Sequence, residues 1–321
     1  MKGLQLLATG GALPNRVVTN EDLRRQVDTS DEWIRTRTGI AERRVLNEES
    51  VLSLAREASL RALENAGLDA DDIDMIIVST AKGETVTPAT ANLLQGEIGA
   101  HCPAFDVNAA CSGFLYALDL VQPYIDSGKA KRILITCAEA ISRLCDWTDR
   151  STCVLFGDGA GAAIVGPGEG LLATRLTSTP NLGALNAYHD PGNNPFQEHK
   201  HPASYLHMAG QEVFKFAVST SSADLRAVAE AAGIGLEEID LFVLHQANMR
   251  ILEAVRTRLG LPKEKFPSNI ARTGNTSSAS VPILLDEVNR AGRLHAGDKL
   301  AMSAFGAGLT TGACVLTWTK E

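Results

Sequence analysis

The stretch NAACSGFLYAL, residues 108–118, is the part of the sequence around which the rest can be interpreted. The apolar run before it, residues 105–107, is typical of the end of a buried strand, and the apolar run after Cys111 is typical of a helix. A cysteine at such a junction lies at a helix N-terminus, where free N–H groups and the helix dipole favour a thiolate over a thiol. Cys111 is therefore either a nucleophile or a buried structural thiol, since free cysteines are among the most buried residues.

The length and composition of the chain restrict its class. With 321 residues, it suits two domains or one duplicated domain, and its net charge of -8 argues against general nucleic-acid binding. The chain has no run of about 18 apolar residues, so we expect no membrane span. The six cysteines form no CxxC pair and no His/Cys group has zinc-like spacing, so we expect no metal site and a cytoplasmic protein with reduced thiols. His199 and His201 are expected in a solvated loop rather than in a metal site.

Hydrophobic patterns predict an alternation of strands and helices. The predicted strands cover residues 4–9, 73–80, 132–140, 156–167, 239–246, 299–305 and 312–318. The predicted helices cover residues 20–26, 31–37, 50–66, 90–98, 111–128, 222–233, 248–259 and 278–290. Continuous apolar strands of this kind predict mainly parallel sheets that are covered on both faces.

The second half of the sequence repeats the first. AGLDADDIDMIIVST begins at residue 66 and AGIGLEEIDLFVLHQ begins at residue 232, with apolar residues matched along the strand. This repeat predicts a duplicated α/β fold, with an N-terminal half over residues 1–170 and a C-terminal half over residues 171–321. Ligands in such folds bind where strands end and helices begin, and both Cys111 and His245 are predicted to lie at such places.

Other chemical groups follow strand ends in the second half. His245 ends the apolar run LFVL, although a lone histidine is more often a satisfied core residue. Asn275 lies in the polar loop RTGNTSSAS, where an ordinary turn asparagine is the alternative. Gly306, in AFGAG, offers a backbone N–H that no side chain shields, which suits an oxyanion. GDGAGAA at residues 157–163 lacks the GK[ST] ending of a phosphate loop and precedes a strand, so tight packing is the better interpretation.

Several motifs occur together and in a family-specific order. They are NAACSGFLYAL, TDRSTCVLFGDGAGAAIV, YLHMAGQEVFKFAV, HQANMRI, GNTSSASVP and AFGAGLTTGA. From near residue 4 to the C-terminus, the chain resembles the β-ketoacyl-acyl carrier protein synthase III family of the thiolase superfamily. The resemblance implies a thiolase-like α/β fold of two duplicated halves stacked as five layers (αβαβα), a homodimer, and an acyltransferase that needs no cofactor besides coenzyme A thioesters as substrates.

The resemblance also implies a reaction. Cys111 would accept the acyl group of an acyl-CoA primer, with the N–H groups of Cys111 and Gly306 as the oxyanion hole. His245 and Asn275 would stabilise the enolate that forms when malonyl-acyl carrier protein loses carbon dioxide. This decarboxylative Claisen condensation would initiate fatty acid biosynthesis. The alternatives are a starter condensing enzyme or acyltransferase of polyketide or other secondary metabolism, and a non-catalytic partner subunit, which would not need all three residues.

Further positions match the family's substrate contacts. Trp33, Arg37, Arg150 and Asn248 correspond to coenzyme A contacts. The expected contacts to the acyl carrier protein are Lys215 and the run from Gln246 to Arg250, that is Gln246, Ala247, Asn248, Met249 and Arg250. Thr87 stands where relatives that use a short straight starter usually have phenylalanine, so we expect starters longer or more branched than acetyl. The segment 186–204 is not well matched, and no role is transferred to it.

Overall fold

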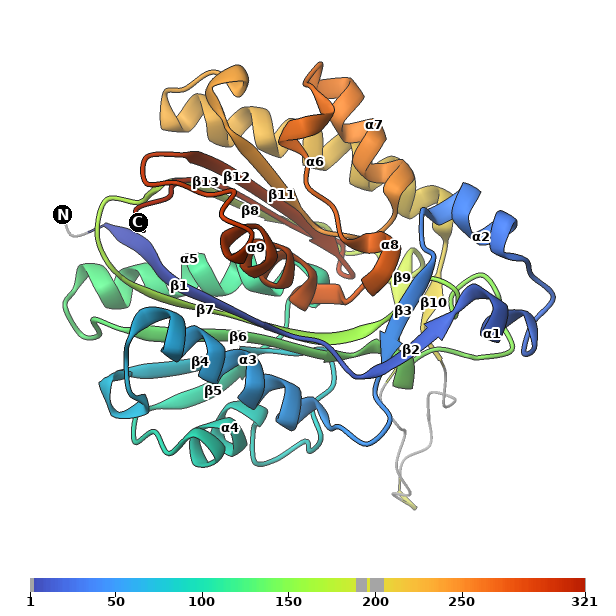
Figure 1. Ribbon diagram of the computed structural model, residues 1–321, viewed down its shortest axis with the longest axis horizontal. Coiled ribbons are helices and arrows are strands. Elements are labelled where there is room, and N and C mark those ends of the chain that lie inside the picture. Colours follow the sequence, from blue (N-terminus) through green and yellow to red (C-terminus); the bar gives the residue numbers. More distant parts are fainter. Residues whose placement is uncertain (1–2, 189–194, 197–204, 321) are drawn as a thin grey trace.

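The computed structural model describes residues 3–188, 195–196 and 205–320. His199, His201 and most of segment 186–204 lie outside the described residues, so the expectation for the two histidines stays a prediction. In the described residues, two β-sheets alternate with three layers of helices (Figure 1). The five-layer αβαβα arrangement expected from the sequence is therefore present.

The first sheet is built from the N-terminal part of the chain. Its strand order is β1 (Leu4–Ala12), β7 (Asp158–Pro167), β6 (Ile133–Ala140), β4 (Met75–Ser79) and β5 (Ala104–Val107). β4 pairs in parallel with β5 and β6, whereas β7 runs antiparallel to both β1 and β6. β5 is therefore an edge strand within this chain.

The second sheet is built from the C-terminal part. Its order is β11 (Leu241–Leu244), β12 (Lys299–Gly306), β13 (Thr310–Thr317) and β8 (Leu171–Ser178). Only β11 and β12 pair in parallel there. The prediction of mainly parallel sheets is thus wrong. The long apolar runs arise because both faces of each sheet are covered, and this burial makes an antiparallel strand such as β7 as apolar as a parallel one.

Helices fill the space between the sheets and cover their outer faces. α5 (Gly113–Asp126) and α9 (Ser280–Arg290) lie between the two sheets and share one core with both. α3 (Val51–Ala66) and α4 (Thr90–Ile98) pack on the outer face of the first sheet. α6 (Gly210–Ala232) and α7 (Met249–Leu259) pack on the outer face of the second. Each half thus contributes one sheet, an outer helical layer and one helix to the central layer.

Most helix boundaries follow local signals. Ser50 caps α3 through its side chain in a capping box with Ser53, and the helix ends at Gly67, whose φ is 64°. α6 begins twelve residues before the predicted start. The prediction missed these residues because the serines and threonines in the middle of α6 have low helix propensity. The first turns of α6 are helical because Val213 and Ala217, four residues apart, are buried in the core on the outer face of the second sheet.

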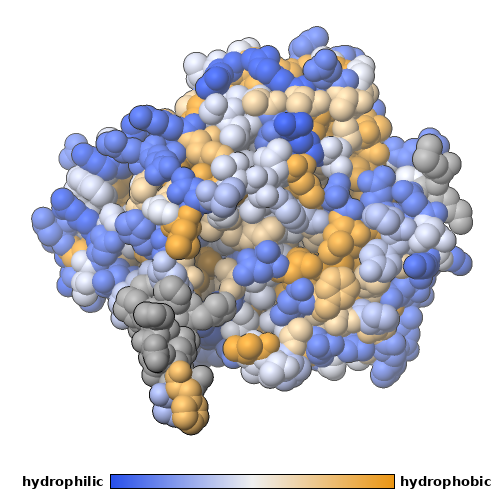
Figure 2. Space-filling view, turned by 180° about the vertical axis from the view of Figure 1, so that it is seen from behind, coloured by the Kyte–Doolittle hydropathy of each residue, from blue (hydrophilic) through white to orange (hydrophobic). Residues whose placement is uncertain are grey.

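Shorter elements complete the fold near one end of the molecule. The hairpin of β2 (Arg16–Thr19) and β3 (Glu42–Val45) encloses α1 (Asn20–Arg24) and α2 (Asp31–Thr38). The remaining strands and α-helix are β9 (Leu185–Asn186), β10 (His207–Met208) and α8 (Ile270–Thr273), and short 3₁₀ helices such as Ala110–Ser112 connect other elements. In the described part of the chain, no helix has the length and apolar character needed to cross a membrane. On the face shown in Figure 2, hydrophobic side chains lie scattered among hydrophilic ones.

Candidate active site

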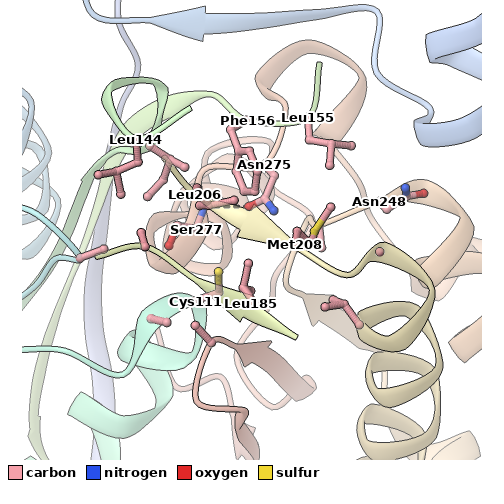
Figure 3. A pocket seen from close by; sticks show the side chains of 18 of the residues that line it. Cys111, Leu144, Leu155, Phe156, Leu185, Leu206, Met208, Asn248, Asn275 and Ser277 are labelled. Atoms are coloured by element: carbon pink, nitrogen blue, oxygen red, sulfur yellow. Dashed lines mark hydrogen bonds between the residues drawn. The ribbon is translucent and has the colours of Figure 1, made fainter. Parts of the chain in front are cut away.

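A cavity of about 810 Å³ brings together the three residues that the sequence placed at strand ends, Cys111, His245 and Asn275. Cys111 comes from the N-terminal half, where a short 3₁₀ turn leads into α5, and the other two come from the C-terminal half. Figure 3 shows the sulfur of Cys111 and the side chain of Asn275 in the same space, surrounded by apolar side chains. The duplicated halves therefore build one site between them.

Cys111 is held in a strained turn. Ala110, directly before it, has a φ of 47°, a left-handed conformation that costs free energy for any residue with a side chain. Burial in the mostly apolar cavity wall raises the pKa of the Cys111 thiol to about 12, and the Ser277 hydroxyl offsets only part of this. The lowered pKa expected from the helix N-terminus is thus not found, and the free thiol is protonated at neutral pH.

His245 follows β11 and is 2% exposed. Burial lowers its pKa to about 3, so the imidazole is neutral. Its Nδ1 lies 2.6 Å from the hydroxyl of Ser280, which also accepts the backbone N–H of Gln246 at 3.3 Å. The Ser280 hydroxyl can donate its proton to Nδ1 while it accepts from Gln246, and in this arrangement the ring proton resides on Nε2. This arrangement makes His245 a neutral hydrogen-bond donor.

Asn275 is fixed through its backbone and its side chain. Its N–H donates to the carbonyl of Leu155 at 2.8 Å, and its carbonyl accepts from Gly157 at 3.0 Å. Its side-chain oxygen accepts the backbone N–H of Ser277 at 2.9 Å. Since Oδ1 already accepts this bond, the Nδ2 amide group of Asn275 is the part of the side chain that can donate to a ligand. A neutral N–H donor of this kind suits a developing oxyanion.

Gly306 ends β12 directly against the cysteine turn. A Cβ atom at this position would lie 2.6 Å from the backbone nitrogen of Cys111 and 3.1 Å from the Cβ of Ala110. Real Cβ atoms do not approach backbone atoms so closely, so only glycine fits here. The structure therefore brings the backbones of Cys111 and Gly306 into contact, as an oxyanion hole made of their two N–H groups requires.

The mouth of the cavity carries the predicted coenzyme A contacts. The guanidinium groups of Arg37 and Arg150 lie 4.6 Å and 5.1 Å from the centroid of the Trp33 ring. Arg150 also donates to the backbone oxygen of Asp28 at 2.6 Å. Asn248 caps α7 by accepting the N–H of Arg250 at 2.8 Å and lines the cavity as well. An aromatic ring flanked by two cations suits a nucleotide with phosphate groups.

The predicted carrier-protein contacts divide into exposed and buried residues. Lys215 and Arg250 are exposed, and the Arg250 guanidinium lies 5.8 Å from the Phe214 ring centroid. Ala247 is buried and Met249 is half-buried. Gln246 is fully buried, donates to the Leu244 carbonyl and accepts from Ser268. The prediction that Gln246 contacts a carrier protein is therefore wrong, because the chain runs inside the protein between β11 and α7.

Thr87 does not line the cavity of its own chain. It is exposed on the loop after β4, and its neighbour Val86, 98% exposed, reaches the cavity mouth. A role for Thr87 in an acyl pocket therefore requires a second copy of the chain and stays a prediction.

The sequence did not single out the apolar wall around Cys111. This wall includes Leu144, Leu155, Phe156, Leu185, Leu206 and Met208 (Figure 3). Nor was Glu139 singled out, although it is the acidic residue in the apolar run ILITCAEA, an available signal of a buried polar role. In the described ranges, no group of His, Cys, Asp or Glu has the arrangement of a metal site.

Comparisons with known proteins agree with this fold. The family "3-Oxoacyl-[acyl-carrier-protein (ACP)] synthase III" matches residues 105–180, and its C-terminal counterpart matches residues 229–318. A β-ketoacyl-[acyl-carrier-protein] synthase III of Xanthomonas campestris is 46% identical, with 98% of each chain covered. The crystal structure of 3-oxoacyl-[acyl-carrier-protein] synthase III from Aquifex aeolicus is 45% identical, covers 98% of this chain and all of its own, and has a TM-score of 0.92.

A solved priming β-ketosynthase of the R1128 polyketide pathway is also similar, with 36% identity, coverage of 99% of this chain and 97% of its own, and a TM-score of 0.91. The five layers and the cysteine at the junction of the halves define a thiolase-like fold. Within that class, the chain belongs to the 3-oxoacyl-[acyl-carrier-protein] synthase III family, 3-oxoacyl and β-ketoacyl being two names for the same group.

Proposed function

We propose that the protein is an acyltransferase that condenses an acyl-CoA primer with malonyl-acyl carrier protein and so initiates fatty acid biosynthesis. The observation that carries the proposal is the shared cavity, in which the thiol of Cys111 meets two neutral donors, His245 and Asn275. Relatives that are 43% to 46% identical over essentially the whole chain carry the name of this activity.

The first step is acyl transfer to Cys111. The sulfur attacks the thioester carbon of acyl-CoA, and the N–H groups of Cys111 and Gly306 stabilise the tetrahedral oxyanion. The carbon–sulfur bond to coenzyme A then breaks, and the thiol proton of Cys111 ends on the departing coenzyme A sulfur. Trp33, Arg37 and Arg150 at the cavity mouth would hold the nucleotide during this step.

The second step is decarboxylation and condensation. The carbon–carbon bond to the malonyl carboxylate breaks, carbon dioxide leaves, and the electron pair passes into the thioester as an enolate. Nε2–H of His245 and the Nδ2 amide of Asn275 donate to the enolate oxygen. The enolate carbon attacks the acyl group on Cys111, a new carbon–carbon bond forms, and the Cys111 thiolate leaves and takes a proton from water.

The partners follow from the same chemistry. Acyl carrier proteins are acidic and the net charge of this chain is -8, so steering has to be local. Arg250, which lines the cavity, and Lys215, in α6, are both exposed and are the side chains that we propose for docking. We also propose a cytoplasmic homodimer.

The alternative pathways have weaker support. The polyketide priming ketosynthase is 36% identical, whereas the synthase III relatives reach 46% over a similar length. A non-catalytic subunit has no need for Cys111, His245 and Asn275 in one cavity.

Separating the two half-reactions tests the proposal. His245→Ala and Asn275→Ala should each accept an acyl group from acyl-CoA as fast as the unmodified protein does. Condensation with malonyl-acyl carrier protein should fall by about 10²–10³-fold in each variant, the cost of removing one oxyanion donor. Acylation is measured by protein mass and condensation by product formation. Equal loss of both steps would show that the two residues act before decarboxylation, contrary to the proposal.

A further inference from the structure

Glu139 is a buried carboxyl group that the reaction described above does not use. It lies near the end of β6 and is 1% exposed, and it forms no ion pair with the residues that the structure describes. Burial raises its pKa to about 7, although hydrogen bonds to its oxygens oppose this. A carboxyl group is costly to bury without partners, so its hydrogen bonds indicate what it does.

The carboxyl oxygens of Glu139 join three segments of the chain. Oε1 accepts from the hydroxyls of Ser277 at 3.1 Å and Ser278 at 2.6 Å. Oε2 accepts the backbone N–H of Ala81 at 3.0 Å, just after β4. The two serines belong to the C-terminal half, so a carboxyl group of the N-terminal half holds a turn of the other half. The N–H of Ala81 is necessarily a donor, and the Ser278 hydroxyl makes the shorter of the two hydroxyl contacts, which suits an accepting carboxylate. The Ser277 hydroxyl is shared between this carboxyl group and the sulfur of Cys111.

The turn that Glu139 holds is the one that orients Asn275. Ser277 has a φ of 52°, a strained conformation for a residue with a side chain, and its N–H fixes the side-chain oxygen of Asn275. The turn also packs against the start of the helix that follows Cys111, because a Cβ on Gly113 would lie 3.4 Å from the Cβ of Ser278. Such a strained conformation persists only where its surroundings enforce it.

We propose that Glu139 is a positioning residue for decarboxylation: its carboxyl group holds the Ser277–Ser278 turn so that the amide of Asn275 faces the enolate oxygen. This inference rests on the proposed function. Acyl transfer uses the N–H groups of Cys111 and Gly306 and does not use Asn275, so Glu139 is not required for that step. The negative charge of Glu139 in fact disfavours the Cys111 thiolate, so removing the charge does not slow the nucleophile.

Glu139→Gln tests this role with almost no change in shape. Glutamine has one acceptor oxygen and one NH₂ group, so it cannot accept from both hydroxyls and from the N–H of Ala81 in the observed geometry. Single-turnover condensation from the acylated enzyme should fall by about 10²-fold, the effect of a misplaced catalytic group. The rate at which acyl-CoA acylates Cys111 should not fall.

Two comparisons separate positioning from general damage. Asp286→Asn is the matched control, because Asp286 is a buried carboxylate that bonds to the Thr9 hydroxyl and to Arg290 outside the cavity. This control should preserve both steps. In an Asn275→Ala background, Glu139→Gln should cause no further loss of condensation, since the two changes remove the same donor.

The outcomes distinguish this inference from the proposed function. A Glu139→Gln enzyme that condenses normally, or loses both steps equally, would overturn the positioning role. Full additivity with Asn275→Ala would overturn it as well. By contrast, an unmodified protein that accepts no acyl group, or does not condense it, would contradict the proposed function itself.

Discussion

Cys111 is a protonated thiol in the resting protein, although it lies at the N-terminus of a helix. A helix N-terminus stabilises a nearby negative charge by about 1 kcal/mol, and by up to about 2 kcal/mol at a partly buried site, which lowers a pKa by about one to one and a half units. Burial acts in the opposite direction and raises the pKa of Cys111 to about 12 from its ordinary value of 9.0. Burial therefore dominates, and the thiolate is formed as part of the attack on the substrate rather than beforehand.

This state of Cys111 predicts the pH dependence of its alkylation. Only the thiolate reacts, and its population below a pKa of about 12 rises about tenfold per pH unit. Iodoacetamide should therefore modify Cys111 faster at each step between about pH 7 and 9, with no plateau. Peptide mass spectrometry separates Cys111 from the other cysteines, which are buried. A plateau in that range would mean that the helix end does outweigh burial.

Single residues differ in how far their roles can be predicted from sequence. Cys111, His245 and Asn275 are recognisable because reactive residue types follow strand ends within distinctive motifs. Ser280 is not recognisable in that way, since its contact with the ring of His245 spans 35 positions in the chain. For Gln246, the sequence motif was misleading. The run from Gln246 to Arg250 was predicted to lie on the surface, but Gln246 itself is buried in the interior.

At the scale of elements, the site depends on the close approach of β12 to the turn before α5. The glycine at the end of β12 permits this approach, since a side chain there would collide with the backbone of Cys111. A backbone atom cannot rotate away as the end of a flexible side chain can. The contact therefore links the two halves where the acyl group is transferred.

Gly306→Ala should strongly slow acylation of Cys111 while the fold is retained, because the new Cβ would displace one of the two oxyanion donors. Loss of such a donor slows the reaction by about 10²–10³-fold. Acylation is followed by protein mass, and folding by circular dichroism. The matched control is Gly96→Ala in α4, where a Cβ meets nothing within 4 Å. It should keep full activity and be as stable or slightly more stable. A fully active Gly306→Ala enzyme would exclude the proposed oxyanion hole.

The bounds of helices were predictable where capping residues and glycines mark their ends. They were less predictable where tertiary contacts determine where an element begins or how a strand runs. The predicted and observed bounds of α4 coincide, and Ser50 and Gly67 end α3 as their types suggest. Strand direction was not predictable, because an apolar run reports that both faces are covered and says nothing about the neighbouring strand. The start of α6 was missed because the serines and threonines in its middle have low helix propensity, which the burial of its apolar face overrides.

At the scale of the whole molecule, the repeat in the sequence corresponds to two sheets and a shared central layer. The change of sheet falls between β7, which ends at Pro167, and β8, which begins at Leu171. We propose a division of the chain into halves at 170, the site lying between them. We propose that the width of the acyl pocket is set in the homodimer, because Thr87 is exposed and does not line the cavity of its own chain.

Thr87 makes a prediction about substrate choice in the homodimer. The unmodified protein should accept starters longer or more branched than acetyl, because threonine fills less of the pocket that we place across the two copies. Thr87→Phe should shift the preference towards acetyl-CoA, as measured by competition among acyl-CoA primers. Thr85→Ala, on the same exposed loop and not among the residues that line the cavity, serves as a control for general disturbance of the loop. A sharp preference of the unmodified protein for acetyl-CoA would contradict this prediction.

The most direct test of the account is the mass of the protein after incubation with mixed acyl-CoAs. We predict a single added acyl group, located on Cys111 by peptide mapping, that disappears when malonyl-acyl carrier protein is supplied and a β-ketoacyl product forms. The Cys111→Ala variant should keep the fold and show neither adduct nor product. An adduct on another residue, or condensation by Cys111→Ala, would contradict the account.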